Sequence, residues 1–292
     1  MYVQQVKEAM TEKEIEDKKL YVEELKHWIE GQPHLPNIED KMLLRFVHSC
    51  YYDIERAKGA LELFCNLRTL APELLTNRDP LSQQMQSVLS WINVAQINIS
   101  KNRCLWLWQL DDPGLVKYDY LLDAKFFFLS TDAYFLDSCH LPDADVVVLD
   151  AHDISLKFIT KFNLSHARKL SKYQEEAIPV RLTQIHVINA PTVIDKIFGL
   201  MKPLLKKELT DLIHFHTPNS TTIFKYFDKE DLPEDFGGTR PSMKELAKNT
   251  ESLLMKWRDE LKSDDLWKAL PIEKKKSNNT PAVSSFRSLA ID

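Results

Sequence analysis

Four short, almost continuously apolar segments limit the folds that this chain can adopt. They are CLWLWQL (104–110), DVVVLD (145–150), QIHVIN (184–189) and LIHFH (212–216). Runs of this kind, rich in β-branched and aromatic residues, are typical of strands buried on both faces. Segments with helical spacing lie between them. The alternation predicts an α/β domain with a largely parallel or mixed sheet.

The helical segments expected between these strands are residues 119–138, 156–177 and 192–209. The third is unusually apolar: Val193, Ile194, Ile197, Phe198, Leu200, Met201, Leu204 and Leu205. Lys202-Pro203 interrupts it, and proline bends or breaks a helix. An apolar helix between two buried strands suits a lid over a hydrophobic cavity, although apolar residues at helical spacing also occur in an ordinary core helix.

Other parts of the chain predict helices outside this alternation. Thr11-Glu12-Lys13-Glu14 has the form of a capping box that opens a helix. Helices are also predicted from Asp40, from Asp53 to Pro72, near 80–98, from Asn219 to Phe227 and from Ser242 to Lys262. The domain boundaries that follow are 1–75 for an N-terminal helical bundle, 76–262 for the α/β domain and 263–292 for a C-terminal tail, which we expect to be disordered.

Composition excludes several classes of protein. The chain has 292 residues but only six glycines, and none forms a GxGxxG, P-loop or GxSxG motif. A net charge of −5 argues against a general nucleic-acid-binding protein. The charged N-terminus lacks the apolar segment of a signal peptide, and no run is long enough to span a membrane. The four cysteines show no metal-ligand spacing, so we expect a cytoplasmic protein with reduced thiols.

The order of motifs resembles the CRAL-TRIO lipid-binding family. The motifs are DKMLLRFVHSCYYDIERA (40–57), VVVLD (146–150), IPVRLTQIHVINAP (178–191), MKPLLKKEL (201–209), LIHFH (212–216) and LPEDFGG (232–238). The resemblance covers roughly residues 15–262. It implies an N-terminal helical bundle followed by an α/β domain, whose sheet forms the floor of a lipid cavity. It also implies that 192–209 is a mobile gate helix.

The resemblance further implies a set of ligand-binding residues. They are Phe127, Ser130, Thr131, Tyr134, Leu156, Phe162, Leu170, Tyr173, Ile178, Leu182, Ile185, Val187, Ile194, Ile197, Phe198 and Met201. The hydroxyl groups among them are candidates to meet the polar end of a ligand, directly or through water. For any single residue, packing in the core is an equally good interpretation.

Phosphoinositide-responsive members of the family carry a basic cluster, which this chain matches only in part. Arg181 is at one of its positions, whereas Thr183 and Leu212 replace arginines and His48 and Cys50 replace basic residues. Phosphate recognition needs several convergent cations. A second set of cations, Lys202, Lys206 and Lys207, could attract an anionic bilayer together with Arg181, or form a solvated helix face.

Two histidine-containing groups were weighed as chemical sites. His214 and His216 point to one face of a strand, with His186 on a neighbouring strand, which suggests a metal site. No acidic or cysteine ligands accompany them, so hydrogen-bonded core histidines are the preferred interpretation. His152, between Asp150 and Asp153, follows a strand end but has no nucleophile beside it. We therefore expect no metal, no cofactor and no catalytic site.

The sequence thus favours a non-enzymatic carrier that moves a small hydrophobic ligand between membranes. Retinoids, carotenoids, tocopherols and related isoprenoids all suit an apolar cavity, because the hydrophobic effect is non-directional. A phospholipid or phosphoinositide exchange protein is the first alternative. An enzyme acting on lipids and a protein-binding scaffold are two others. The membrane contact is expected to be transient, and a monomer is favoured, although the oligomeric state is open.

Overall fold

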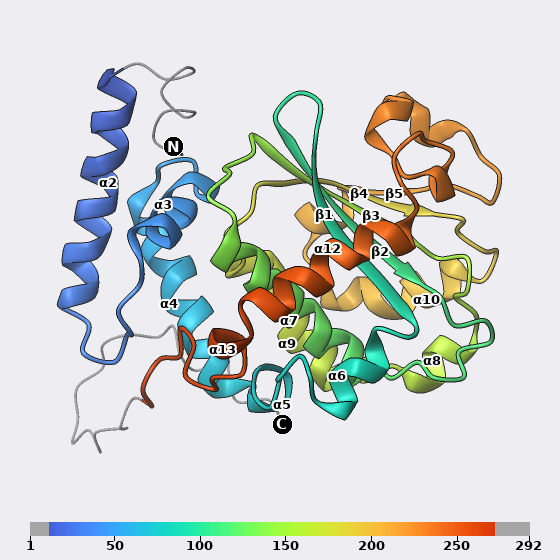
Figure 1. The fold of residues 1–292 in the computed structure, drawn as a ribbon, viewed down its shortest axis with the longest axis horizontal. Coiled ribbons are helices and arrows are strands. Elements are labelled where there is room, and N and C mark those ends of the chain that lie inside the picture. The colour runs from blue at the N-terminus through green and yellow to red at the C-terminus, as the bar shows by residue number, and fades with distance from the viewer. Residues whose placement is uncertain (1–11, 272–292) are drawn as a thin grey trace.

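The computed structural model describes residues 12–271, which form a five-stranded sheet with helices packed around it (Figure 1). The strands lie side by side in chain order. They are β1 (Ile92–Ile99), β2 (Arg103–Leu110), β3 (Ala144–Asp150), β4 (Leu182–Ile188) and β5 (Ile213–Phe215). β1 pairs with β2 in the antiparallel sense, and the other neighbours pair in parallel. The sequence prediction of a mixed α/β sheet is confirmed.

Helices connect each pair of parallel strands. They are α7 (Tyr120–Asp137), α8 (Lys157–Lys161), α9 (Leu164–Glu176), α10 (Ile194–Met201), the 3₁₀ turn η1 (Lys202–Leu204) and α11 (Lys207–Thr210). Crossover connections between parallel strands are right-handed almost without exception. Because the strands follow one another in a single direction, right-handed crossovers place all these helices on the same face of the sheet.

The chain after β5 first covers the opposite face of the sheet, and its later helices then pack against β1 and α7. This segment holds three 3₁₀ turns, η2 (Thr222–Lys225), η3 (Lys229–Asp231) and η4 (Glu234–Phe236), and two helices, α12 (Met243–Lys256) and α13 (Arg258–Leu261). Ile223, Phe227 and Phe236 pack there against Leu105 and Val148 of the sheet. The helix expected from Asn219 to Phe227 is therefore reduced to η2. Asn219 has φ +62°, a left-handed conformation that does not start a helix.

The N-terminal helices form a bundle beside the sheet (Figure 1). They are α2 (Glu12–Glu30), α3 (Asp40–Ser49), α4 (Ile54–Leu70), α5 (Pro72–Leu75) and α6 (Gln83–Val88). Asp53 caps α4, as expected, by accepting a hydrogen bond from the backbone N–H of Arg56. The proposed capping residue Thr11 lies outside the described residues. The domain boundary at residue 75 stays a prediction: α5 ends there, and α6 packs against α7.

The helix predicted near 80–98 is wrong for most of its length. Only 83–88 are helical, and 92–99 form the edge strand β1. The sequence INVAQINI alternates too weakly to be distinguished from a helix, with Ala95 and Gln96 interrupting its apolar residues. Pairing with β2 and contact with α12, where the Thr250 hydroxyl donates to the Val94 carbonyl at 2.7 Å, decide its conformation.

Two further expectations need correction. The segment 156–177 forms two helices, because Asn163 caps a new helix through the N–H of His166. The tail expected from residue 263 is ordered through residue 271, with Trp267 7% exposed and packed against Phe64. The Ala269 N–H donates to the Cys65 carbonyl at 3.2 Å, and this hydrogen bond holds the segment against α4. Residues 272–292 lie outside the described residues.

A buried ion cluster joins the bundle to the α/β layer. Asp132 of α7 is 0% exposed and binds Arg68 of α4 and Arg78 of the α5–α6 connection, each at 2.8 Å. Both arginines are 2% exposed. The cluster fixes the position of α7 relative to the bundle.

We expect Asp132→Asn to destabilise the protein by about 3 kcal/mol or more, because two buried guanidinium groups lose their counter-charge. Urea unfolding followed by circular dichroism measures the change. Asp40→Asn is the matched control, since Asp40 forms an exposed ion pair with Lys26, and solvent-exposed ion pairs contribute little to stability. Equal losses in the two variants would contradict the assigned role of Asp132.

Candidate functional site

A cavity of about 370 Å³ lies between the sheet and the helices on its crossover face. Its wall is almost entirely apolar and aromatic. Cavities of this size and character are typical of sites for small hydrophobic molecules.

The floor of the cavity consists of two adjacent rows of side chains that cross all five strands. The rows are Gln96, Trp106, Val147, Ile185 and Ile213, and Val94, Trp108, Leu149, Val187 and Phe215. All ten residues line the cavity. Successive residues of a strand point to opposite faces, so residues two apart on each strand share this floor. The register of the sheet therefore defines the floor.

The walls and the cover come from α7, α9 and α10. On α10, Ile194, Ile197, Phe198 and Met201 line the cavity at i, i+3, i+4 and i+7 spacing. This is one face of a helix. Leu205 and Leu209 continue the cover beyond α10. The apolar stripe seen in the sequence thus faces the cavity rather than a closed core.

Twelve of the sixteen residues that the family resemblance implied lie on the cavity wall. They are Phe127, Ser130, Thr131, Leu170, Ile178, Leu182, Ile185, Val187, Ile194, Ile197, Phe198 and Met201. Their contact with a ligand stays a prediction.

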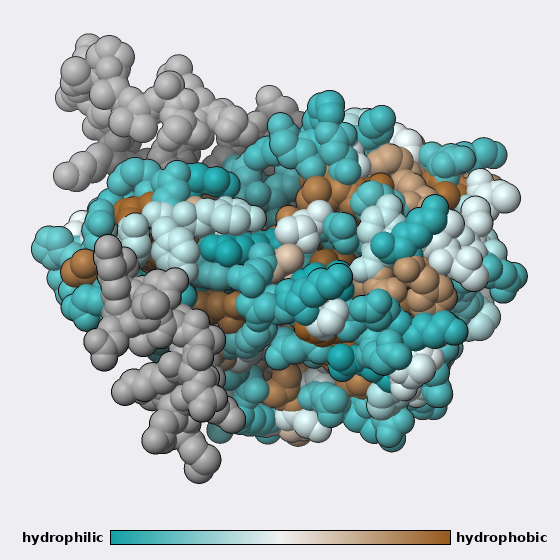
Figure 2. All heavy atoms as spheres, turned by 90° about the horizontal axis from the view of Figure 1, so that it is seen from above, coloured by the Kyte–Doolittle hydropathy of each residue, from teal (hydrophilic) through white to brown (hydrophobic). Residues whose placement is uncertain are grey.

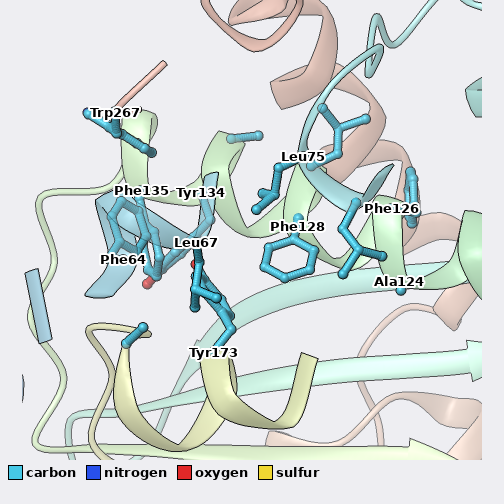
Figure 3. Close-up of a cluster of buried hydrophobic side chains, with 14 of the residues drawn as sticks. Phe64, Leu67, Leu75, Ala124, Phe126, Phe128, Tyr134, Phe135, Tyr173 and Trp267 are labelled. Atoms are coloured by element: carbon cyan, nitrogen blue, oxygen red, sulfur yellow. The ribbon is translucent and has the colours of Figure 1, made fainter. Parts of the chain in front are cut away.

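The other four lie off the wall. Tyr173 is 1% exposed and packs against Phe128 in the core between α4, α7 and α9 (Figure 3). Tyr134 lies behind Trp106, with ring centroids 4.9 Å apart. Phe162 supports the wall from behind Tyr120. Leu156 precedes α8 and is 45% exposed. The family resemblance implied that these residues line the cavity, but the docking of the helices turns them away from it.

Several wall residues were missed. They include Trp106, Trp108, Tyr118, Tyr120, Asp123, Asp145, Val147, Leu149 and Phe158. A signal for some of them was present. Extending the alternation of Ile185 and Val187 to the neighbouring strand gives Val147 and Leu149, and stepping back one turn from Phe127 on α7 gives Asp123.

The cavity wall contains few polar groups, and most are already hydrogen-bonded. The Ser130 hydroxyl donates to the Phe127 carbonyl at 3.2 Å, whereas the buried Thr131 hydroxyl has no partner. Asp145 accepts from the Trp106 indole N–H at 2.8 Å and from the Arg181 backbone N–H at 2.7 Å. Burial raises the pKa of Asp145.

Asp123 is a second carboxyl group on the wall. Its Oδ1 accepts from the Trp108 indole N–H at 3.1 Å, and its Oδ2 accepts from the Tyr118 hydroxyl at 2.9 Å. Burial raises its pKa to about 6, although these two hydrogen bonds favour the ionised form. At neutral pH the carboxyl group is therefore ionised next to an apolar cavity.

The four cations considered for anionic-lipid contact do not converge. Arg181 donates through Nε to the His48 carbonyl at 2.8 Å and lies over the Tyr51 ring. Lys206 pairs with Glu176, and Lys207 pairs with Asp211. Lys202 is exposed on η1. The structure brings no two of them to a common anion site.

The three strand histidines lie on the face opposite the cavity, where His186 is hydrogen-bonded to His216 and stacks on His214. His186 Nδ1 is 3.0 Å from His216 Nε2, and His216 Nδ1 is 2.7 Å from the Thr222 hydroxyl. Burial lowers the pKa of His186 to about 3. Between residues 12 and 271, no group of three or more potential ligand side chains has the geometry of a metal site.

His152 is held between two carboxylates outside the cavity wall. Its Nδ1 is 3.1 Å from Asp150 and its Nε2 is 3.3 Å from Asp153. The hydrogen bond to Asp150 raises the pKa of His152. These contacts fit the structural role that the sequence favoured.

Apolar side chains also reach the surface near the cover of the cavity. Leu200 of α10 is 49% exposed and Phe215 of β5 is 40% exposed. On the face seen in Figure 2, hydrophobic side chains reach the surface in several places among hydrophilic ones. None of the helices described has both the length and the apolar character needed to cross a membrane.

The protein has a mixed sheet, crossover helices on one face of it and an apolar cavity between the two. These features place it in the class of α/β proteins that enclose a hydrophobic cavity. Residues 124–238 match the model of the CRAL/TRIO domain, and residues 14–85 match that of the Pinta-like, UBA domain. Residues 124–238 of the chain are thus similar to the CRAL/TRIO domain.

The relatives are distant. The alpha-tocopherol transfer protein-like protein of Homo sapiens is 22% identical over 203 residues, which are 70% of this chain and 59% of that protein. Clavesin-1 of Rattus norvegicus is 28% identical over 96 residues, 33% of this chain and 27% of that protein. The crystal structure of Sfh5 superposes with a TM-score of 0.47 and 13% identity, covering 79% of this chain and 91% of that one.

The raised pKa of Asp123 predicts a pH dependence of stability for the ligand-free protein. The pKa rises from 3.8 to about 6 on folding, so the folded state binds more protons between these values. The stability of the wild type relative to Asp123→Asn should therefore fall as pH rises from about 4 to about 6. Urea midpoints of both proteins across this range test the prediction, and a difference that does not change with pH would contradict it.

Proposed function

We propose that this protein binds a small hydrophobic molecule in the cavity and exchanges it with membranes. The observation that carries the proposal is the apolar cavity, which is covered by the segment of residues 194–210. We call this segment the gate segment; it comprises α10, η1 and α11. The similarity to alpha-tocopherol transfer protein-like proteins supports a role in ligand transfer.

The affinity for such a ligand would come from burial of its apolar surface. Each methylene group transferred from water contributes about 0.8 kcal/mol, so a ligand of about twenty carbons gains on the order of 10 kcal/mol or more. A ligand bound this strongly leaves slowly into water. Exchange at a membrane surface avoids that barrier.

The contacts of the gate segment support its movement. In the part of the chain that the structure describes, α10 makes no side-chain hydrogen bond to another element, and its contacts are apolar, such as the Phe198–Phe215 ring pair. The following turn is anchored to α9: the Ser171 hydroxyl donates to the Leu204 carbonyl at 3.1 Å, and Glu175 accepts from the Lys206 N–H at 3.1 Å. We infer that α10 moves while residues 204–206 stay fixed.

The wall residues favour a carrier over the alternatives. Among the described residues, those that line the cavity include no histidine or cysteine, which a lipid-hydrolysing enzyme would use beside a nucleophile. The paired lysines 206 and 207 count against a phosphoinositide headgroup site, which needs converging cations. The aromatic floor suits a flat or polyene isoprenoid such as a retinoid, carotenoid or tocopherol.

Organic extraction of the natively purified protein, followed by absorption spectroscopy and mass spectrometry, tests the cargo directly. We expect one isoprenoid or polyene in stoichiometric amount. A phospholipid mixture would instead support the exchange protein. A protein without extractable lipid that also takes up neither retinol nor α-tocopherol would overturn the carrier proposal.

The proposed membrane contact of the gate segment predicts a kinetic effect. Leu200→Gln should slow retinol transfer between phosphatidylcholine vesicles about fivefold, because about 1 kcal/mol of apolar contact with the bilayer is lost. Leu70→Gln is the control, since Leu70 is 48% exposed, like Leu200, but lies at the end of α4. Equilibrium retinol binding should be equal in both variants. Equal transfer rates would argue against the gate segment as the membrane contact.

A further inference from the structure

Asp123 stands out among the groups on the cavity wall because no cation of residues 12–271 pairs with its charge. Asp145 resembles it in accepting a hydrogen bond from a floor tryptophan, but the positive charges of Arg45 and Arg181 act on Asp145. The neighbouring charge that acts on Asp123 is that of Asp119, which has the same sign. Burial of a carboxylate without a cation is costly unless hydrogen bonds satisfy it.

The hydrogen bonds that Asp123 receives leave part of its capacity unused. An ionised carboxylate offers about four lone-pair positions. The Trp108 indole and the Tyr118 hydroxyl occupy one on each oxygen. Both donors are themselves wall residues, so the carboxylate lies at the cavity surface between them. A further donor can approach it only from the cavity or from solvent within it.

The wall around the cavity offers few donors of its own. The Trp106 and Trp108 indole N–H groups are both bound to carboxylates. The Ser130 hydroxyl donates to its own helix. What the cavity presents near Asp123 is thus an acceptor with unused hydrogen-bonding capacity, in aromatic surroundings formed by Tyr118, Tyr120 and Phe158.

We infer that Asp123 accepts a hydrogen bond from a hydroxyl group of the bound ligand, so that the cavity selects hydrophobic alcohols and phenols over their ethers and esters. This inference rests on the proposed function and names the chemical class of its ligand. A hydroxyl group fits because it donates to the carboxylate yet costs far less to remove from water than a charged amine. Hydrogen bonds to charged groups are the stronger ones, and an acceptor left unsatisfied disfavours a ligand that cannot donate.

The test compares two ligand pairs that differ only in the donor: all-trans-retinol with its methyl ether, and α-tocopherol with its methyl ether. Binding to the full chain at pH 7.5 is measured by quenching of tryptophan fluorescence. For the wild type, we expect at least one pair in which the alcohol or phenol binds about tenfold or more tightly than the ether. This comparison needs no mutation, so it does not depend on the folding of a variant.

Asp123→Asn should reduce this preference about tenfold, because the amide offers one oxygen in place of two and can donate to an ether oxygen. Asp119→Asn is the matched control. Asp119 caps α7 by accepting from the Leu122 N–H, is exposed and lies off the cavity wall, and asparagine is an equally good cap. The preference of Asp119→Asn should equal that of the wild type.

The outcomes separate the two proposals. If the wild type binds an alcohol and its ether equally in both pairs, the inference about Asp123 is overturned while the carrier function stands. A preference that persists in Asp123→Asn, or that falls equally in Asp119→Asn, overturns it as well. If the wild type binds none of the four probes, the inference and the carrier function fail together.

Discussion

The buried contact of Asp132 with Arg68 and Arg78 is the interaction on which the rest of the structure depends. It joins α7, α4 and the α5–α6 connection at a point that solvent does not reach. The guanidinium of Arg68 also lies over the Phe64 and Trp267 rings, so the C-terminal segment that carries Trp267 packs against the same ion cluster. Because breaking a buried ion pair leaves an uncompensated charge, these segments are held in one arrangement. The helix α7 is thereby fixed to the bundle while its other face borders the cavity.

The cavity follows from this arrangement and from the handedness of the crossovers. Right-handed connections along consecutive parallel strands put α7, α9 and α10 on one face of the sheet. The bundle and α9 hold α7 in place. Among the described residues, α10 is held by apolar contacts, and hydrogen bonds to α9 anchor the turn that follows it. A strongly fixed wall and a weakly fixed cover are the properties that a carrier needs. Asp123 adds a single uncompensated acceptor to this otherwise apolar chamber.

Much of the fold and part of the site could be predicted from the sequence. The buried strands, the break at Lys202-Pro203 and the apolar face of α10 were visible because their periodicity is local. The strand β1 was missed since INVAQINI carries no clear period, and its pairing with β2 decided its structure. Tyr173, which the family resemblance implied as a wall residue, faces α4 and α7 instead, because the docking of α9 and not its sequence decides which of its sides meets the cavity. Trp267 was assigned to a tail because the short apolar group of residues 266–270 has no regular period that predicts packing.

By itself, the sequence determined the class of this protein: an α/β layer with buried strands, an N-terminal helical bundle and an apolar helix able to cover a cavity. The spacing of hydrophobic residues and the positions of prolines are local features of the sequence, so they can be recognised without knowledge of the fold. Only the tertiary structure decided which side chains share the chamber. Trp106, Trp108 and Asp123 are far from the gate segment in the chain. Strand register and helix docking bring them to the same cavity as that segment. Register and docking depend on the packing of the whole molecule, which no single segment encodes.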